Sequence, residues 1–169
     1  MRRGLTGIIT IALLLSAAPA MAGGQSDLAE ARLATARFHK VAHAEAAGYG
    51  STLDTLGCFQ NPGVGGMGLH YLDGSLLDAT VDEKAPEALV YEMRDDGTLE
   101  LVALEYIVPI AAWNEEELPS LFGQHFHAHP VLPLYVLHAW IWRPNPLGMF
   151  QDWNPNVAMC PEGVPIFGA

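Results

Sequence analysis

Histidine is the residue type in this chain best suited to carry chemistry, and three of the seven histidines alternate in the stretch GQHFHAHP. On an extended strand His125, His127 and His129 would point the same way, about 7 Å apart between neighbours, so that two of them could reach one metal ion. Gly123 precedes them and Pro130 follows, a setting that also fits a solvated loop holding metal only loosely. Both interpretations stay open, and we keep only His127 as a candidate ligand.

Two other histidines and one glutamate stand among apolar residues. His70 lies in GLHYL, Glu105 in VALEYIV and His138 in PLYVLHAWIW. A buried ionisable side chain without a partner is costly, and the economical arrangement is that the three meet. Two imidazoles and a carboxylate from separate strands would make a three-ligand metal site with an open position for water or substrate. They could instead form a hydrogen-bonded polar core or a His–Glu acid–base pair.

The leading hypothesis is therefore a metal-binding protein with His70, Glu105 and His138 as ligands and His127 as a candidate fourth. Nitrogen and carboxylate ligands favour zinc first, with copper or iron next. Whether an open position also supports catalysis is left undecided. One alternative is a metal-free protein that binds a small ligand in a pocket lined by its many Trp and Tyr residues. Another is a structural or partner-binding module of the cell envelope.

Several enzyme and cofactor classes lack their motifs in this sequence. There is no G-x-S-x-G nucleophile motif, no G-x-G-x-x-G after a strand, no C-x-x-C-H and no H-E-x-x-H. No nucleotide or haem is therefore expected. His39 and His43 have a spacing that can chelate a metal, but the charged residues around them favour a solvated helix face.

The start of the chain has the pattern of a secretory signal peptide. MRRG is a short basic segment, an apolar run follows, and AMA before Gly23 matches a cleavage site. We expect residues 1–22 to be the signal peptide, residues 23–169 the mature chain, and the protein to be periplasmic or extracellular. An uncleaved anchor is the alternative, because about 18 apolar residues can just span a bilayer. No membrane span is expected after cleavage.

The mature chain is strongly acidic. Arg2 and Arg3 would leave with the signal peptide, so that six basic and all 19 acidic residues remain, with a net charge of −13. Such a charge repels nucleic acid and anionic lipid. It favours metal ions and small neutral or cationic ligands as partners. The oligomeric state is not predicted.

The two cysteines predict one disulfide bond. An even count in an exported chain favours a bond between Cys58 and Cys160, which would close a loop of about 100 residues. Thiolate ligation of a metal is the alternative, and an oxidising compartment disfavours it.

The elements that must position these residues follow from local patterns. A long helix is expected over 26–50, with Ser26 or Asp27 as its cap. The glycines within 57–68 predict turns that bring backbone close to another element, followed by a short strand LHYLDG. EALVYEM and TLELVALEYIVP flank the turn DDG and predict a hairpin, in which Glu105 shares a face with Leu99, Leu101, Ala103 and Ile107.

One more strand is expected in PLYVLHAWIW, with His138, Trp140 and Trp142 on one face and an irregular, proline-rich tail after it. Together these elements predict a single α+β domain in which a long N-terminal helix packs on a curved antiparallel sheet.

The order of GGMGLHY, LVALEYIVP, YVLHAWIWRPNP and WNPNVAMC along the chain resembles an uncharacterised family of small exported bacterial proteins with GGMGxHY and LHxWxWxxNP motifs. The resemblance covers nearly all of the mature chain. It implies that His70, Glu105, His138 and the Cys58–Cys160 pair belong to the family pattern, and it supplies no activity.

Overall fold

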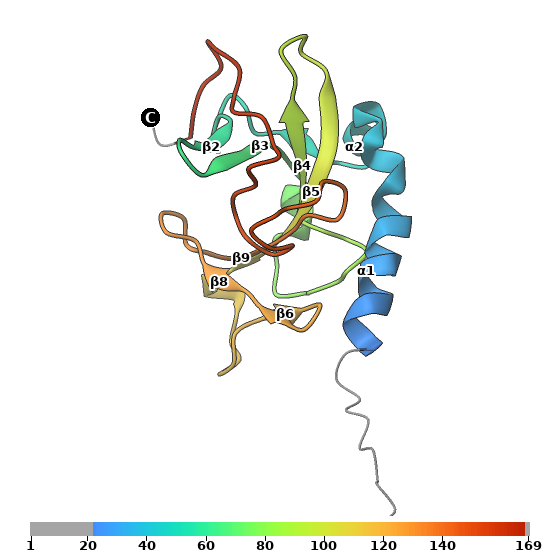
Figure 1. The fold of residues 1–169 in the computed structure, drawn as a ribbon. Helices are drawn as coiled ribbons and strands as arrows, with labels where there is room; N and C mark the ends of the chain where they lie inside the picture. Colours follow the sequence, from blue (N-terminus) through green and yellow to red (C-terminus); the bar gives the residue numbers. More distant parts are fainter. Residues whose placement is uncertain (1–21, 168–169) are drawn as a thin grey trace, which may run out of the picture.

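The computed structural model describes residues 22–167, in which helices cover one face of an antiparallel sheet (Figure 1). This arrangement confirms the α+β fold class. The expected signal peptide lies outside the described residues apart from Ala22, so its cleavage stays a prediction, as does the single domain 23–169. Within the described part of the chain, no helix is long and apolar enough to cross a membrane.

Short helices and an antiparallel sheet make up the regular structure. The helices are α1 (Ala22–Thr35), the 3-10 helix η2 (Ala36–His39), α2 (Val41–Ala46), and the 3-10 helices η3 (Gly74–Leu76) and η4 (Ile110–Ala112). The strands are β1 (Gly50–Ser51), β2 (Phe59–Asn61), β3 (Gly65–Leu72), β4 (Ala88–Met93), β5 (Leu99–Pro109), β6 (Ser120–Leu121), β7 (Gln124–His125), β8 (His127–Ala128) and β9 (Leu134–Ala139).

The main sheet has the strand order β1-β3-β4-β5-β9-β8, with β2 also paired to β3, while β6 and β7 form a separate pair. Neighbouring strands run antiparallel throughout. The register of β4 against β5 confirms the predicted hairpin. β5 is an interior strand of the sheet, which gives its residues strand neighbours on both sides.

The predicted long helix is wrong in its length and in its start. α1 has 14 residues and begins at Ala22, so Ser26 and Asp27 lie inside it rather than capping it. An added Cβ at Gly24 would lie 3.1 Å from the Phe122 carbonyl oxygen, so this first turn packs closely on another segment. The helix ends at Thr35, whose hydroxyl donates to the Ala31 carbonyl oxygen at 2.7 Å, a bond that competes with regular helix geometry.

The glycine-rich stretch is more regular than predicted, since residues 65–68 form the first half of β3. Its glycines do bring backbone close to other elements. A Cβ at Gly65 would lie 2.5 Å from the Asn154 carbonyl oxygen, and one at Gly66 would lie 2.3 Å from the Ala158 carbonyl oxygen. The glycines therefore let the C-terminal tail lie directly on β3.

Strand alternation in β5 is broken by a bulge. Val90 of β4 is opposite Ala103, whereas Tyr91 is opposite Leu101, so Val102 is an extra residue. The predicted face is correct from Ala103 onward. It is wrong for Leu99 and Leu101, which lie in the cluster on the other side of the sheet.

β9 is shorter than predicted and ends at Ala139. After it, the Trp140 backbone N–H donates to the Met149 carbonyl oxygen in the tail. Trp140 stays on the face of His138, where the centroids of the two stacked rings lie 6.2 Å apart. Trp142 packs instead with the helix-side cluster. The predicted common face therefore holds for Trp140 and fails for Trp142.

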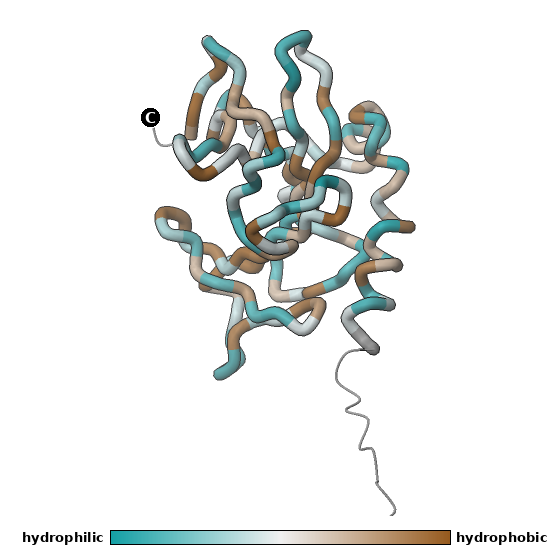
Figure 2. Tube along the Cα trace, in the orientation of Figure 1, coloured by the Kyte–Doolittle hydropathy of each residue, from teal (hydrophilic) through white to brown (hydrophobic). Residues whose placement is uncertain are grey.

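The sheet separates two apolar layers. On one face, Leu28, Ala31 and Phe38 of the helical segment pack against residues of β3, β4, β5 and β9. Figure 2 shows hydrophobic and hydrophilic bands alternating along α1, as expected of a helix with one face on the core. On the other face, tail residues Val157 and Trp153 cover the sheet.

The predicted disulfide is present between Cys58 and Cys160, 102 positions apart in the sequence. It joins the segment just before β2 to the C-terminal tail. The Cys58 backbone N–H also donates to the Pro165 carbonyl oxygen at 2.7 Å. Covalent and backbone bonds together hold the tail against the face of the sheet opposite the helices.

Candidate metal centre

β5 and β9 place Glu105 and His138 directly opposite each other. His70 comes from β3, where it is opposite Val90, and β4 separates β3 from β5. Ala88 is the β4 residue opposite Glu105, so only a methyl group lies there between the converging side chains. Paired residues of antiparallel strands point to the same face, so Glu105 and His138 share one face, and His70 reaches Glu105 diagonally across β4.

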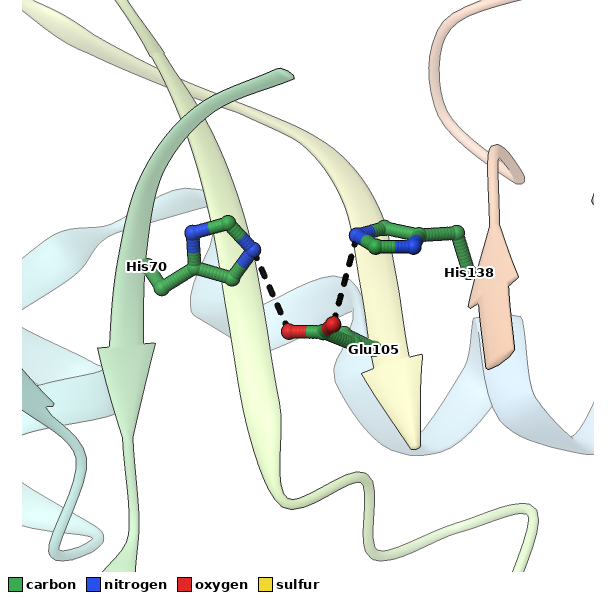
Figure 3. A group of neighbouring side chains, drawn as sticks. All are labelled: His70, Glu105 and His138. Atoms are coloured by element: carbon green, nitrogen blue, oxygen red, sulfur yellow. Dashed lines mark ion pairs between the residues drawn. The ribbon is translucent and has the colours of Figure 1, made fainter. Parts of the chain in front are cut away.

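The side chains of His70, Glu105 and His138, here called the His–Glu–His group, converge as predicted (Figure 3). Nε2 of His70 lies 3.1 Å from one Glu105 carboxylate oxygen, and Nε2 of His138 lies 3.5 Å from the other. One ligand atom from each residue lies within 4.8 Å of the other two. Each residue belongs to a different strand, so the sheet brings together side chains that are far apart in the sequence.

These distances suit a metal ion. In a tetrahedral zinc site, with ligands at about 2.0–2.1 Å, ligand atoms lie about 3.3 Å from one another. The nitrogen-to-oxygen distances of 3.1 and 3.5 Å, each to a different oxygen of the carboxylate, lie near that value. Two neutral imidazoles and a carboxylate are also a donor set of a kind found at catalytic zinc sites. The group could therefore hold a metal ion.

The three side chains of the His–Glu–His group are buried, and burying their polar atoms without hydrogen-bond or metal partners costs free energy. The exposed fractions are only 5 % for His70, 6 % for Glu105 and 2 % for His138. Within residues 22–167, Nδ1 of His70 and both ring nitrogens of His138 have no hydrogen-bond partner of acceptable geometry. Buried polar atoms normally have such partners, so these ring nitrogens require an explanation, and a bound ion is one.

Electrostatics favour a negative carboxylate between the two imidazoles. Burial raises the pKa of Glu105, but the facing His138 and His70 outweigh it and bring that pKa to about 2. Burial lowers the pKa of His138, yet Glu105 and Asp152 outweigh it, and the net shift is upward. The group therefore pairs a carboxylate with a proton on imidazole, and a divalent cation can replace that proton.

Asp152 is a further member of the site that the sequence did not single out. Its Oδ1 lies 3.4 Å from Nδ1 of His138, and its Oδ2 lies 3.3 Å from Nε2 of His127. Burial raises the pKa of Asp152, but His138 and His127 outweigh it and lower that pKa. Asp152 lies in an irregular tail segment, where neither periodicity nor apolar neighbours could have identified it.

The structure places His127 at the edge of the site, outside the His–Glu–His group. It lies on β8, its side chain is 45 % exposed, and its ion pair is with Asp152. His125 lies on β7 and is exposed, so it does not join the site. His129 is half-buried and accepts hydrogen bonds at Nδ1 from the backbone N–H groups of Val131 and Leu132.

The remaining histidines lie on the helical segment. His39 and His43 are exposed, in agreement with the predicted solvated face. The ring centroid of His39 lies 4.5 Å from that of Trp142. Nδ1 of His43 lies 3.2 Å from the Arg37 carbonyl oxygen. Neither belongs to the group of three that could hold a metal.

A cavity of about 150 Å³ opens onto the His–Glu–His group. Its lining combines buried residues, such as Phe59, Met67 and Val136, with half-buried Trp153 and Phe167. Of the Tyr and Trp residues expected to line a pocket, only Trp153 is among the lining residues. All five tyrosines pack instead on the helix side, where Tyr135 is partly buried and the buried ones are Tyr49, Tyr71, Tyr91 and Tyr106.

Two buried carboxylates outside the site have structural partners. Glu87 accepts the Ile107 backbone N–H at 2.8 Å. Glu92 accepts from the Arg143 guanidinium and from the Ala158 backbone N–H, each at 2.7 Å, which ties the tail to β4. Their burial was not predicted, because it depends on the tail and on the register of β4.

Comparison of the chain with protein-family models, with curated proteins and with solved structures finds no match. The resemblance to a family of exported bacterial proteins therefore stays a prediction. The candidate site rests on its own geometry, which is a buried His–Glu–His group at an apolar cavity.

Proposed function

We propose that this chain is an exported metal-binding protein of the periplasm or cell exterior, with His70, Glu105 and His138 as its ligands. Zinc is the first choice of metal, with copper or iron next. The observation that carries the proposal is the pair of imidazole Nε2 atoms 3.1 and 3.5 Å from one buried carboxylate.

A purely hydrogen-bonded polar core is the main competing interpretation, and His138 argues against it. Both of its ring nitrogens are buried and lack a partner of acceptable geometry, although carboxylate oxygens lie 3.4 and 3.5 Å away. A polar core built for stability would satisfy these atoms. A ligand nitrogen facing a metal, and a second nitrogen facing an orienting carboxylate, explain both positions.

Three protein ligands leave a coordination position open toward the cavity. A bound zinc ion supplies a Lewis acid at that position. His127 remains the candidate for a fourth ligand. It would have to leave Asp152 to join the group, since its Nε2 is 3.3 Å from that carboxylate.

Metal content tests the proposal directly. Protein purified without a metal-affinity column should contain, or bind on titration, one zinc ion per chain. At zinc concentrations 100 times the dissociation constant, the free energy of unfolding should rise by about 2.7 kcal/mol. Absence of both stoichiometric metal and any shift in melting temperature with zinc, copper or iron would contradict the proposal.

Substitution of the proposed ligands tests where the metal binds. His70→Ala and His138→Ala should lose the bound metal and the zinc-dependent rise in melting temperature. His125→Ala is the matched control, because this exposed histidine lies outside the group and should bind zinc as the wild type does. Retention of metal by the His70→Ala/His138→Ala double variant would place the binding site elsewhere.

Export has its own test. The full chain expressed in a Gram-negative host should appear in the periplasmic fraction with Gly23 as its first residue, as expected for cleavage after Ala22. Full-length protein retained in the membrane would favour the uncleaved anchor.

The second candidate function is a metal-free protein that binds a small ligand, and the cavity of about 150 Å³ favours it. In that case the His–Glu–His group would supply hydrogen bonds rather than ligands. Ligand affinity unchanged by chelators would support this alternative over the metal site.

A further inference from the structure

The cavity above the His–Glu–His group limits the size of what can bind there. Its volume is about 150 Å³. An apolar cavity of about this size holds a molecule such as benzene, with about six or seven non-hydrogen atoms. A sugar, nucleotide or peptide is too large to lie wholly inside it, so a ligand that the cavity encloses must be a small molecule.

Polarity is concentrated in part of the cavity lining. The polar lining residues are His70, Glu105, His127, His129, His138 and Asp152. The other lining residues are apolar, among them Phe59, Ile107 and Val136. A ligand with several polar groups would bury some of them against apolar walls without partners, at a cost of a few kcal/mol each. The lining therefore fits a ligand with an apolar body whose polar part faces these ionisable side chains.

The charges on the cavity lining favour a neutral ligand over an anionic one. The carboxylates on the lining are Glu105 and Asp152, and together they balance one divalent cation when the imidazoles are neutral. An anionic ligand would add an uncompensated negative charge to a largely apolar cavity, in a chain whose formal net charge is already −11. A neutral molecule avoids this cost.

We infer that the site binds a small uncharged molecule with an apolar body of about benzene size and one lone-pair donor, which fills the open coordination position while the body fills the cavity. The inference rests on the proposed metal site. It adds the size and the donor atom of the ligand to that function, and it narrows the small neutral or cationic ligands that the acidic composition favours.

Two probes of equal shape test the role of the donor atom. 4-Methylpyridine and toluene have the same size, but only the first carries a ring nitrogen. At pH 8, where 4-methylpyridine is neutral, calorimetry on the zinc-loaded protein should show it binding at least tenfold more tightly than toluene. In the cobalt(II)-loaded protein it should also shift the visible absorption bands, because its nitrogen enters the coordination sphere. Equal affinities, or an unchanged spectrum, would overturn the inference.

Charge and size are tested by two more probes. Benzoate should bind at least tenfold more weakly than 4-methylpyridine, and 4-phenylpyridine, which exceeds the cavity, should do the same. A preference for benzoate would overturn the neutral-ligand assignment, and tight binding of 4-phenylpyridine would overturn the size limit.

A cavity-filling variant separates the cavity from the metal. Val136→Phe should keep one zinc per chain and lose at least tenfold in affinity for 4-methylpyridine. Val64→Phe is the control, since Val64 is 40 % exposed and does not line the cavity. If Val136→Phe does not fold, the probe comparison on the wild type still decides the matter. Metal bound without probe selectivity overturns this inference alone, whereas absence of metal overturns the proposed function and this inference with it.

Discussion

Asp152 and His138 face each other across the candidate metal centre, with Oδ1 of the carboxylate 3.4 Å from Nδ1 of the ring. The ring nitrogen that faces Glu105 is the other one, Nε2. If a metal binds Nε2, the N–H on Nδ1 faces Asp152, and carboxylates beside metal-bound histidines commonly orient the ring from this side. The tail that carries Asp152 is therefore part of the site.

Asp152→Asn should weaken zinc binding by about 10–100-fold while leaving the three ligands in place. The amide keeps the size of the side chain but removes the negative charge that the His138 N–H faces. Competition titration against a chromogenic chelator measures the change. Asp95→Asn is the control, because Asp95 is exposed in the turn between β4 and β5. An affinity within twofold of the wild type would show that Asp152 does not position His138.

Zinc binding should release protons, because Glu105 and Asp152 raise the pKa of His138 and so favour a protonated ring, and the metal must displace that proton. Affinity should accordingly fall as the pH is lowered. Calorimetric titrations in two buffers of different ionisation enthalpy measure the number of protons released. Binding enthalpies that do not depend on the buffer would contradict the assignment of His138 as a protonated partner of Glu105.

Glu87 should make the protein less stable as the pH rises. Burial raises its pKa to about 7, with Asp78 and Glu105 adding to the shift, although the Ile107 backbone N–H opposes it. A group whose pKa is higher in the folded state contributes stability that is full below the unfolded value of about 4.3 and is lost as the pH rises through the folded value. The loss attributable to Glu87 between pH 5 and pH 8 should be at most about 3 kcal/mol.

Glu87→Gln should remove that pH dependence, since an amide can still accept the Ile107 N–H and does not ionise. Urea unfolding at pH 5 and pH 8 measures the difference between variant and wild type. Glu116→Gln, at an exposed position, is the control and should follow the wild type. The prediction fails if both proteins lose the same stability between the two pH values.

Gly66→Ala should displace the tail from β3. An added Cβ would lie 2.3 Å from the Ala158 carbonyl oxygen, which is backbone and cannot move aside as a side chain would. We expect a loss of about 1–3 kcal/mol in stability and weaker zinc binding, because the tail also carries Asp152. Gly74→Ala is the control, since a Cβ there meets nothing within 4 Å. Equal melting temperatures for the two variants would contradict the close packing of tail and strand.

Local patterns in the sequence determined much of this protein. The hairpin of β4 and β5, the strand around His138 and the placement of Glu105 on the face of Ala103 and Ile107 all follow from alternation and turn residues, which act over a few neighbouring positions. The meeting of His70, Glu105 and His138 was also predictable, because a buried ionisable group requires a partner and the apolar neighbours of each indicated burial.

Only the tertiary structure decided the rest. The bulge at Val102, the strand formed by Gly65 and Gly66, and the position of Asp152 depend on the register between strands and on where the tail docks. Helix α1 begins before Ser26 and ends at Thr35, earlier than predicted, and its first turn packs on the backbone of Phe122. These are contacts between residues far apart in the sequence, and their energies outweigh the local preferences of helix caps and glycines.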